Sequence, residues 1–340
     1  MTRTRHRMPK PVRLLAIAAS LLTVGGTVIG ISVATAHEGE PVDRRNFIDI
    51  TKVQGVVAEP PAGRNASRGT FTSECGRNEN EHRNPDNFIV TPGVRNGAHH
   101  THDYVGNLST NADSTNGSLS RAGTTCRNGD KSTYFWPVLR QIGNNNARRG
   151  GQDSNNARRS DQGGARDGNV GTILTPSLVR LEFRGNPREK VTAMPRFLRT
   201  ITGDAQAATN GDENARASWT CTDAPEKRTT KYPLCSTGGQ VMRVMDFPSC
   251  WDGRNVDSQD HRSHLVFPGR NGNCPQGTQA VPQLRMTLTY DVAPRPTFAV
   301  DSFPEQEHNP ITDHADFANV MPEQLMDRAV ACINEGRNCT

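Results

Sequence analysis

The chain is short of hydrophobic residues and lacks the common catalytic signatures. Only 33% of its 340 residues are hydrophobic, which predicts a modest core and long loops. It contains no G-x-S-x-G, H-E-x-x-H, phosphate-binding glycine loop or dinucleotide fingerprint. These absences argue against serine hydrolases with that nucleophile turn, H-E-x-x-H metalloproteases, P-loop enzymes and Rossmann dehydrogenases. No C-x-x-C pair occurs either, which argues against a cysteine-ligated zinc cluster.

An excess of basic charge is also missing once the N-terminus is set aside. The full chain carries 40 Lys and Arg against 35 Asp and Glu. Five of the basic residues lie before residue 14, so the remainder holds 35 residues of each sign. A formally neutral chain gives no electrostatic reason to expect a nucleic-acid partner.

Residues 1–36 have the pattern of an export signal. A basic start is followed by an apolar run from Leu14 to Val33, and Ala34-Thr35-Ala36 supplies the small-x-small cleavage pattern. An uncleaved membrane anchor is the alternative, because the run approaches spanning length. Three glycines inside the run and the Ala-x-Ala ending favour cleavage. We therefore expect a secreted, extracellular protein, monomeric and without membrane attachment after cleavage.

All eight cysteines follow the signal. An even number of cysteines in an exported chain predicts disulfides, which stabilise loops where the core is thin. Of the many pairings possible, we predict the one that joins sequential neighbours: Cys75–Cys126, Cys221–Cys235, Cys250–Cys274 and Cys332–Cys339.

Short apolar segments between polar loops predict a mostly β protein. The predicted strands cover 69–72, 88–90, 130–139, 178–184, 191–202, 241–247, 282–292 and 298–300. Strands do not alternate with crossover helices, which argues against a parallel α/β sheet. We therefore expect an antiparallel β-sandwich or a jelly-roll-like fold with long, disulfide-stapled loops.

One helix is predicted, at the C-terminus. Apolar residues recur at i, i+3 and i+4 between Met321 and Ile333, with Pro322 in the first turn and Gly336 as the stop. The expected domain plan is a polar leader over 37–68 and a single domain over 69–340. Within that domain, residues 143–170 are rich in Asn, Arg and Gly, which predicts a low-complexity surface insertion.

His100 and His102 form an H-x-H pair. On a strand, residues two apart point to the same face, so both imidazoles can converge on one divalent metal ion. The alternative is a pair of solvated or hydrogen-bonded loop histidines. The third ligand would come from His261, His264 or His314.

The segment from Phe247 to Pro268 concentrates polar chemistry, and a further cluster follows at 308–317. We expect a catalytic group of five residues from these two segments: Asp260, His261, His264, His314 and Asp316. We expect a second group to bind substrate, with the tryptophans stacking on sugar: Lys131, Tyr134, Trp136, Trp251, Asp252 and Arg262.

Two mechanisms are open to a pocket built from these groups. One is metal-assisted chemistry. The other is metal-free acid–base chemistry, in which Arg262 or Lys131 would neutralise a uronic carboxylate in a lyase. The alternative to both is structural: His–Asp hydrogen bonds that hold long loops together.

Several of these motifs resemble one family, the secreted domain of unknown function DUF1996 of actinobacteria and fungi. The resemblance covers Gly69 to Cys339, apart from the insertion, and rests on these segments: His100-Thr101-His102 with Val105-Gly106-Asn107, Lys131-Ser132 with Tyr134 and Trp136-Pro137, Pro248 to Gly253, Asp257-Ser258, Asp260 to His264, Val281 to Leu284, and His314 to Phe317.

What the resemblance implies is a secreted protein that works on cell-wall material, since fungal members are sometimes joined to carbohydrate-binding modules. It assigns no catalytic residue. We therefore expect a protein that binds or cleaves an extracellular or cell-wall polysaccharide; as an enzyme, it would be a glycoside hydrolase or polysaccharide lyase. The alternatives are a non-catalytic, disulfide-stapled wall or surface protein and a metal-binding secreted protein without turnover.

Overall fold

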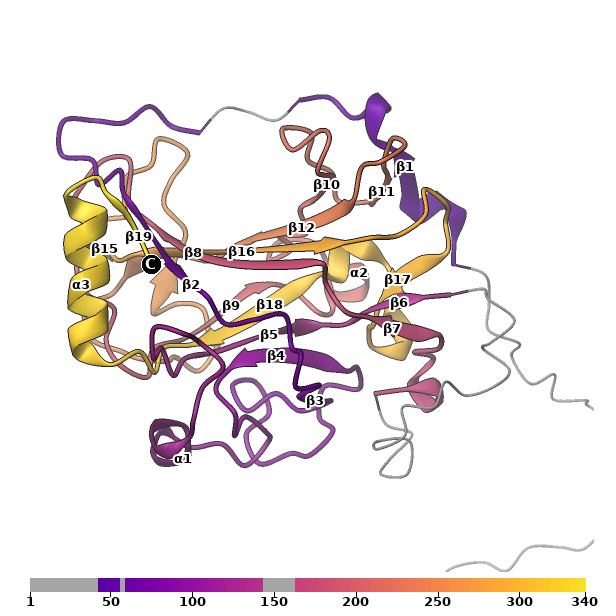
Figure 1. The fold of residues 1–340 in the computed structure, drawn as a ribbon, viewed down its shortest axis with the longest axis horizontal. Coiled ribbons are helices and arrows are strands. Elements are labelled where there is room, and N and C mark those ends of the chain that lie inside the picture. Colours follow the sequence, from indigo (N-terminus) through magenta and orange to yellow (C-terminus); the bar gives the residue numbers. More distant parts are fainter. Residues whose placement is uncertain (1–41, 56–58, 143–162) are drawn as a thin grey trace, which may run out of the picture. The chain divides into compact units, whose positions relative to one another are not determined.

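Two β-sheets form the centre of the fold in the computed structural model, which describes residues 42–55, 59–142 and 163–340 (Figure 1). The export signal predicted for residues 1–36 lies outside the described residues. The larger sheet has the strand order β10–β12–β16–β8–β2–β19. Its strands are Trp219–Cys221 (β10), Val241–Asp246 (β12), Gln283–Tyr290 (β16), Leu178–Arg184 (β8), Thr70–Ser73 (β2) and Asn338–Cys339 (β19).

The second sheet has the order β3–β4–β5–β18–β9, and every neighbouring pair in it is antiparallel. Its strands are Arg83–Asn84 (β3), His102–Gly106 (β4), Thr133–Pro137 (β5), His314–Ala318 (β18) and Arg199–Gly203 (β9). This five-stranded sheet includes the H-x-H motif and the 314–317 motif on separate strands, with β5 between them.

Aromatic side chains join the two sheets face to face. The ring of Phe183 on β8 lies 6.5 Å from that of Tyr134 on β5 and 6.0 Å from that of Phe317 on β18, centroid to centroid. All three rings are buried in one large hydrophobic cluster. Facing sheets with a shared core are the arrangement of a β-sandwich, so the predicted mostly β, antiparallel fold class is confirmed.

Smaller sheets and three helices complete the described elements. The small sheets contain Phe47–Asp49 (β1), Leu139–Gln141 (β6), Thr172–Leu174 (β7), Tyr232–Leu234 (β11), Cys250–Trp251 (β13), Leu265–Val266 (β14), Gln279–Ala280 (β15) and Phe298–Val300 (β17). The helices are Asn116–Arg121 (α1), Ala207–Asn210 (α2) and Glu323–Asn334 (α3). The C-terminal helix α3 confirms the predicted helix: it starts after Pro322, and Gly336 beyond it adopts a positive φ of +77°.

The predicted leader is attached to the domain where the structure describes it. β1 pairs in parallel with β11, and the ring of Phe47 lies 5.0 Å from that of Tyr232. The four disulfides join sequential neighbours, so the predicted pairing is confirmed: Cys75–Cys126, Cys221–Cys235, Cys250–Cys274 and Cys332–Cys339. None of the helices in the described ranges has the length and hydropathy needed to cross a membrane.

Three strand predictions need correction. Residues 88–90 form a turn, because the Asn87 side chain accepts from the backbone N–H groups of Ile89 and Val90 and so closes the chain locally. The predicted strand over 130–139 is divided between β5 and β6. Of 191–202, only the end enters a strand, β9, which follows Phe197 at a positive φ of +72°.

The turn at 87–90 covers the outer face of the five-stranded sheet, the face turned away from the six-stranded sheet. A second, smaller hydrophobic cluster lies there, and its buried members include Phe88, Ile89, Tyr104 and Phe135. Because side chains alternate along a strand, β4, β5 and β18 each contribute to both clusters. The outer face is therefore a protected surface on which polar residues can also be buried.

Candidate metal centre

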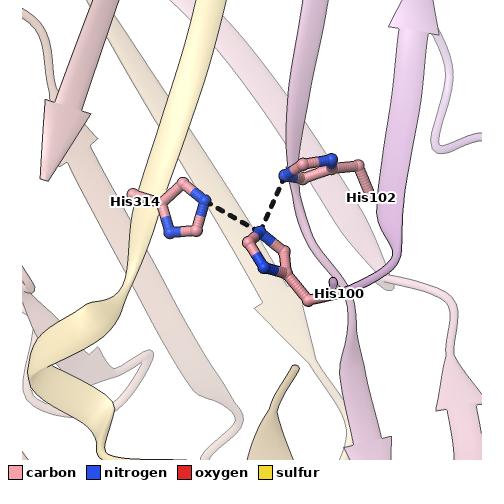
Figure 2. A group of neighbouring side chains, drawn as sticks. All are labelled: His100, His102 and His314. Atoms are coloured by element: carbon pink, nitrogen blue, oxygen red, sulfur yellow. Dashed lines mark hydrogen bonds between the residues drawn. The ribbon is translucent and has the colours of Figure 1, made fainter. Parts of the chain in front are cut away.

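Three histidines meet on the outer face of the five-stranded sheet (Figure 2). Asp316 on β18 is opposite Phe135 on β5, which places His314 level with Pro137. His102 on β4 is opposite the same proline. His100 comes two residues before His102, while Thr101 between them turns away: its N–H donates to Asp301 and its hydroxyl to the Gly163 carbonyl.

The three Nε2 atoms converge. Nε2 of His100 lies 3.0 Å from Nε2 of His102 and 3.2 Å from Nε2 of His314. All three side chains are buried, with residue exposures of 1%, 0% and 5% in that order. The convergence of the H-x-H pair predicted from residue spacing is confirmed, and of the three candidates for a third ligand the structure brings His314.

Hydrogen bonds fix which nitrogen carries the proton. Nδ1 of His102 lies 3.0 Å from the Asp86 carbonyl and Nδ1 of His314 lies 2.8 Å from the Thr312 carbonyl. A carbonyl oxygen only accepts, so both Nδ1 atoms donate and both Nε2 atoms keep a lone pair in the neutral ring. Such backbone acceptors are what metal-binding histidines ordinarily use.

Burial keeps these rings neutral. It lowers the pKa of His100 and His102 well below the ordinary value, and the neighbouring imidazoles lower both further. Burial likewise lowers the pKa of His314. Two lone pairs then point at His100 Nε2, which has at most one proton to donate. A cation at the centre would satisfy all three nitrogens at once.

The spacing suits a first-row divalent metal. Ligand nitrogens held about 2.0–2.1 Å from a tetrahedral zinc ion lie about 3.3 Å from each other, close to the distances between these Nε2 atoms. Imidazole is a good ligand for zinc, copper, iron and nickel. A tetrahedral ion held by these three imidazoles would keep one position for a water or substrate, as in catalytic zinc sites.

A buried ion pair positions the strands that flank the centre. Arg243 on β12 reaches across the core, pairs with the carboxylate of Asp313 and donates from Nη1 to the Pro137 carbonyl at 2.9 Å. Both charged groups are at most 1% exposed. One guanidinium from the six-stranded sheet thus fixes the residue before His314 and the proline level with it.

The end of the predicted insertion lies beside the centre. Residues 143–162 are outside the described part of the chain, but Asn169 is buried and donates to the carbonyls of His99 and Ser302. The ring of Phe303 lies 5.3 Å from that of His100. The described end of this segment is therefore not peripheral, because it packs against the loop that leads into β4.

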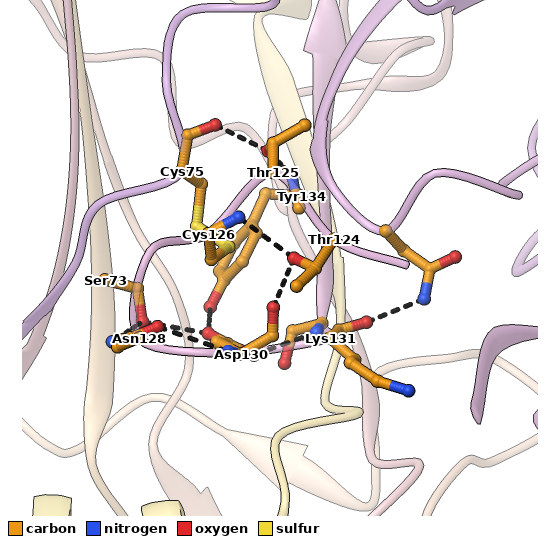
Figure 3. The surroundings of a disulfide bond; sticks show 12 residues. Ser73, Cys75, Thr124, Thr125, Cys126, Asn128, Asp130, Lys131 and Tyr134 are labelled. Atoms are coloured by element: carbon orange, nitrogen blue, oxygen red, sulfur yellow. Dashed lines mark hydrogen bonds between the residues drawn. A yellow bond between two sulfur atoms is a disulfide. The ribbon is translucent and has the colours of Figure 1, made fainter. Parts of the chain in front are cut away.

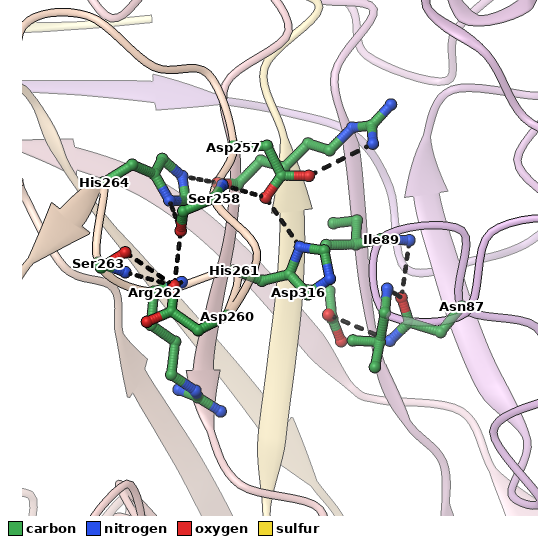
Figure 4. A network of polar contacts seen from close by, with 12 residues as sticks. Asn87, Ile89, Asp257, Ser258, Asp260, His261, Arg262, Ser263, His264 and Asp316 are labelled. Carbon is green, nitrogen blue, oxygen red and sulfur yellow. Dashed lines mark hydrogen bonds and ion pairs between the residues drawn. The ribbon is translucent and has the colours of Figure 1, made fainter.

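Asp316 lies two residues after His314 on the same face of β18 (Figure 4). It is fully buried, and Oδ1 accepts from the Asn87 amide at 3.2 Å. Oδ2 has no hydrogen-bond partner among the described residues. Burial raises the pKa of this carboxyl to about 7, although the Asn87 amide and Arg262 oppose the shift. Sequence reasoning selected Asp316 but missed Asn87, which has no motif to mark it.

His261 and Asp257 form a close pair in the loop after β13. Nδ1 of His261 lies 2.8 Å from Oδ1 of Asp257, and the two side chains are 22% and 23% exposed. Asp257 also accepts from the Ser258 N–H and contacts Arg199. His261 has a positive φ of +54°, a conformation that residues other than glycine seldom adopt. Asp257 was not among the predicted catalytic residues, though its place four residues before His261 was a usable signal.

Asp260 and His264 serve the same loop as internal hydrogen-bond partners. Oδ1 of Asp260 accepts from the N–H groups of Arg262 and Ser263 and from two serine hydroxyls, which holds the pKa of this exposed carboxyl far below its usual range. His264 is buried, with Nδ1 2.8 Å from Ser258 Oγ and Nε2 2.7 Å from the Arg199 carbonyl. The structure places neither residue at the three-histidine centre.

Two predicted sugar-stacking rings lie in the core. Tyr134 and Trp136 are 0% exposed. The Tyr134 hydroxyl donates to Asp130 beside the Cys75–Cys126 disulfide (Figure 3), and Lys131 Nζ donates to the Ser120 carbonyl at 3.0 Å. Neither ring presents a face to a surface ligand in this structure.

The other predicted substrate-binding residues lie nearer the surface. Trp251 is half-buried and lines a hollow of about 340 Å³ together with Arg196, Met326 and Asp327. Asp252 accepts from the backbone N–H groups of the next turn. Arg262 donates to the Gly203 carbonyl at 2.8 Å, at the end of β9.

Comparison with known proteins gives one family. The model of the family described as "Domain of unknown function (DUF1996)" matches residues 87–320. This range includes all three histidines of the centre, Asn87, Asp316 and the loop of His261. No curated protein and no solved structure matched the chain.

Proposed function

The chain belongs to the DUF1996 family, and from that premise we propose that it is an exported protein that holds a divalent metal ion and binds or cleaves an extracellular or cell-wall polysaccharide. The observation that supports the metal is the convergence of three neutral imidazole rings. Nε2 of His100 lies 3.0 Å from that of His102 and 3.2 Å from that of His314. Four disulfides support export, because such bonds persist in oxidising compartments.

His100, His102 and His314 would hold the ion. A divalent metal in such a site supplies a Lewis acid and lowers the pKa of a bound water. The chain's own residues do the rest: Asp86 and Thr312 orient two of the rings through their carbonyls, and Arg243 fixes the strands. For an enzyme of this kind we propose glycoside hydrolysis.

The hollow at Trp251 supports a sugar ligand. A half-buried indole offers an apolar face to the C–H groups of a sugar ring, and its own Nε1–H is bound inward to the Asn255 carbonyl at 2.6 Å. Glu323, Asp327 and Arg196 line the same hollow. Two carboxylates beside one guanidinium favour hydroxyl groups over a ligand with many negative charges, so we propose a neutral polysaccharide.

A second function has an observation in its favour. The three histidines are at most 5% exposed, and they line neither the hollow at Trp251 nor the one beside Cys75. A closed site of this kind suits a metal-binding or wall protein without turnover, in which the ion stabilises the sheet.

Metal analysis separates these possibilities. Elemental analysis of the exported protein should give about one metal per chain, lost in a His100→Ala/His102→Ala variant and retained in His99→Ala. His99 is the matched control, because it is adjacent in sequence but its side chain is 46% exposed. No metal in the wild type would reject the centre.

Polysaccharide assays then decide whether the metal-loaded protein acts on a glycan. Binding and release of reducing ends should be measured on laminarin, xylan and polygalacturonate, with and without chelator. Cleavage that chelator abolishes would support the enzyme. Metal without binding or cleavage would favour the protein without turnover.

A further inference from the structure

The loop that contains His261 lies along β9, on the side of the sheet where Asp316 is buried. Arg262 donates to the carbonyl of Gly203 at 2.8 Å, and His264 Nε2 lies 2.7 Å from the carbonyl of Arg199. These two acceptors are the last and first residues of β9. Midway between them, Ile201 is opposite Asp316 on β18. Figure 4 shows the His261 ring turned toward the Asn87–Asp316 pair.

The Asp257 carboxylate sets the tautomer of His261. A carboxylate only accepts, so at 2.8 Å it takes the proton on Nδ1 and leaves the lone pair on Nε2. Nε2 makes no hydrogen bond to any described residue, and the side chain is 22% exposed. Asp257 is itself held by Arg199 and by the Ser258 N–H, so the ring is oriented with one nitrogen free.

Asp316 supplies an unmet acceptor nearby. Its Oδ2 is buried and, within the described chain, receives no hydrogen bond. Buried polar atoms are rarely left in this state, and those that are commonly mark a place for a water or a ligand. Asn87 already occupies Oδ1. A water molecule would satisfy Oδ2 with one of its protons and could present the other to the ring of His261.

We propose that Asp257 and His261 form an acid–base dyad that acts on a water molecule held at Asp316 and Asn87. The proposal rests on the proposed function, because a base of this kind would serve the cleavage of a polysaccharide. Two strand positions, about 7 Å, separate Asp316 from His314, so this base is distinct from the metal centre.

The step is a proton transfer and needs no further reactant. One O–H bond of the water breaks, its proton moves to Nε2 of His261, and the electron pair stays on the oxygen as hydroxide. Asp257 stabilises the imidazolium that forms and does not itself take the proton. In the reverse step the imidazolium returns its proton to a leaving oxygen.

Histidine chemistry tests the dyad without knowledge of the substrate. Side-chain ¹⁵N NMR of the zinc-loaded protein should show the neutral His261 with its proton on Nδ1. Diethyl pyrocarbonate, which acylates a free imidazole nitrogen, should modify His261 severalfold faster than His99. In Asp257→Asn the His261 rate should fall about tenfold, the effect of losing one charge-assisted hydrogen bond. Asp212→Asn, which changes an exposed carboxylate outside this loop, should leave it unchanged.

Each of these measurements either supports or contradicts the dyad. A His261 proton on Nε2, a rate no faster than that of His99, or a rate unchanged in Asp257→Asn would overturn the dyad. Circular dichroism of each variant checks that the fold is kept. Zinc content of the same samples reports on the metal centre separately, so the dyad and the proposed function can fail independently.

Discussion

His102 and His314 stand on opposite sides of Pro137 in one row of the five-stranded sheet, on strands that do not touch each other. The strand between them contributes a proline, whose small ring leaves room for the two imidazoles and for His100. The row continues to Gly203 on β9, which is opposite His314. The centre therefore depends on the register of four strands.

The triad predicts a metal-dependent stability. At a free zinc concentration about 100 times the dissociation constant, binding should raise the free energy of unfolding by about 2.7 kcal/mol. Thermal unfolding of the wild type with and without zinc should show an upward shift of several degrees. His314→Ala should abolish the shift and His99→Ala should keep it. An equal shift in both variants would place the zinc elsewhere.

The close packing of the β9 backbone against His314 predicts that position 203 must be glycine. Gly203 has a positive φ of +81°, and an added Cβ would lie 2.3 Å from the Asp313 carbonyl oxygen and 2.8 Å from the His314 Cα. Gly203→Ala should therefore cost about 1 kcal/mol for the left-handed backbone and more for the displaced strand, and zinc binding should weaken.

Gly129→Ala is the matched control for this substitution. Gly129 has nearly the same φ, +82°, but no atom lies within 4 Å of an added Cβ. Urea unfolding and zinc titration should show only the backbone cost there, with zinc affinity unchanged. Equal losses of zinc affinity in the two variants would contradict the claim that Gly203 positions His314.

Loop length predicts unequal contributions from the disulfides. Cys75–Cys126 has a sequence separation of 51 and encloses β4 with two of the proposed metal ligands, whereas the separation of Cys332 and Cys339 is seven. Chain entropy gives about 4 kcal/mol for the first and about 2 kcal/mol for the second. Paired Cys→Ala variants compared by urea unfolding should differ in this order. A larger loss from Cys332–Cys339 would contradict the entropic argument.

Asp316 predicts a pH-dependent stability in the chelator-treated protein. Its pKa rises from 3.8 to about 7 on folding. Between these values the unfolded chain has lost the proton and the folded chain keeps it, so wild-type stability falls as pH rises toward 7 and levels off above it. The Asp316→Asn variant has no carboxyl group at this position, so its stability does not fall with pH in this way. Its stability relative to wild type should therefore improve by up to about 1.4 kcal/mol per pH unit.

Urea unfolding at pH 4.5, 5.5, 6.5 and 8 measures this difference. Asp260→Asn is the control, because the pKa of Asp260 is lowered rather than raised by its hydrogen bonds and its charge is constant across this range. A flat difference between Asp316→Asn and wild type would mean that Asp316 is ionised in the folded protein throughout.

The sequence predicted features whose cause is local. Alternation located β8 and β16, the cysteine order matched the four disulfides, and the H-x-H spacing placed two imidazoles together. It also misjudged local chemistry at Phe88 and Ile89, where the apolar pattern of a strand was overridden by the Asn87 side chain closing a turn.

What depended on long-range pairing was beyond the sequence. His314 joins the centre only because β5 lies between β4 and β18, and three histidines fitted the third position equally well by spacing. Tyr134 and Trp136 were predicted to bind a ligand. Both are buried, because their side of β5 packs against the other sheet, and the spacing of residues does not show which side that is. Asn87 acts through Asp316, at a sequence separation of 229, which a single sequence does not reveal.

The sequence separation of 214 between His100 and His314 has a consequence for the protein's survival. An ion bound by both is a reversible cross-link around most of the domain, spanning far more chain than any of its disulfides. Unlike a disulfide, it opens whenever the surroundings are poor in metal. We expect the persistence of this protein among extracellular proteases to follow the local supply of zinc or a similar ion.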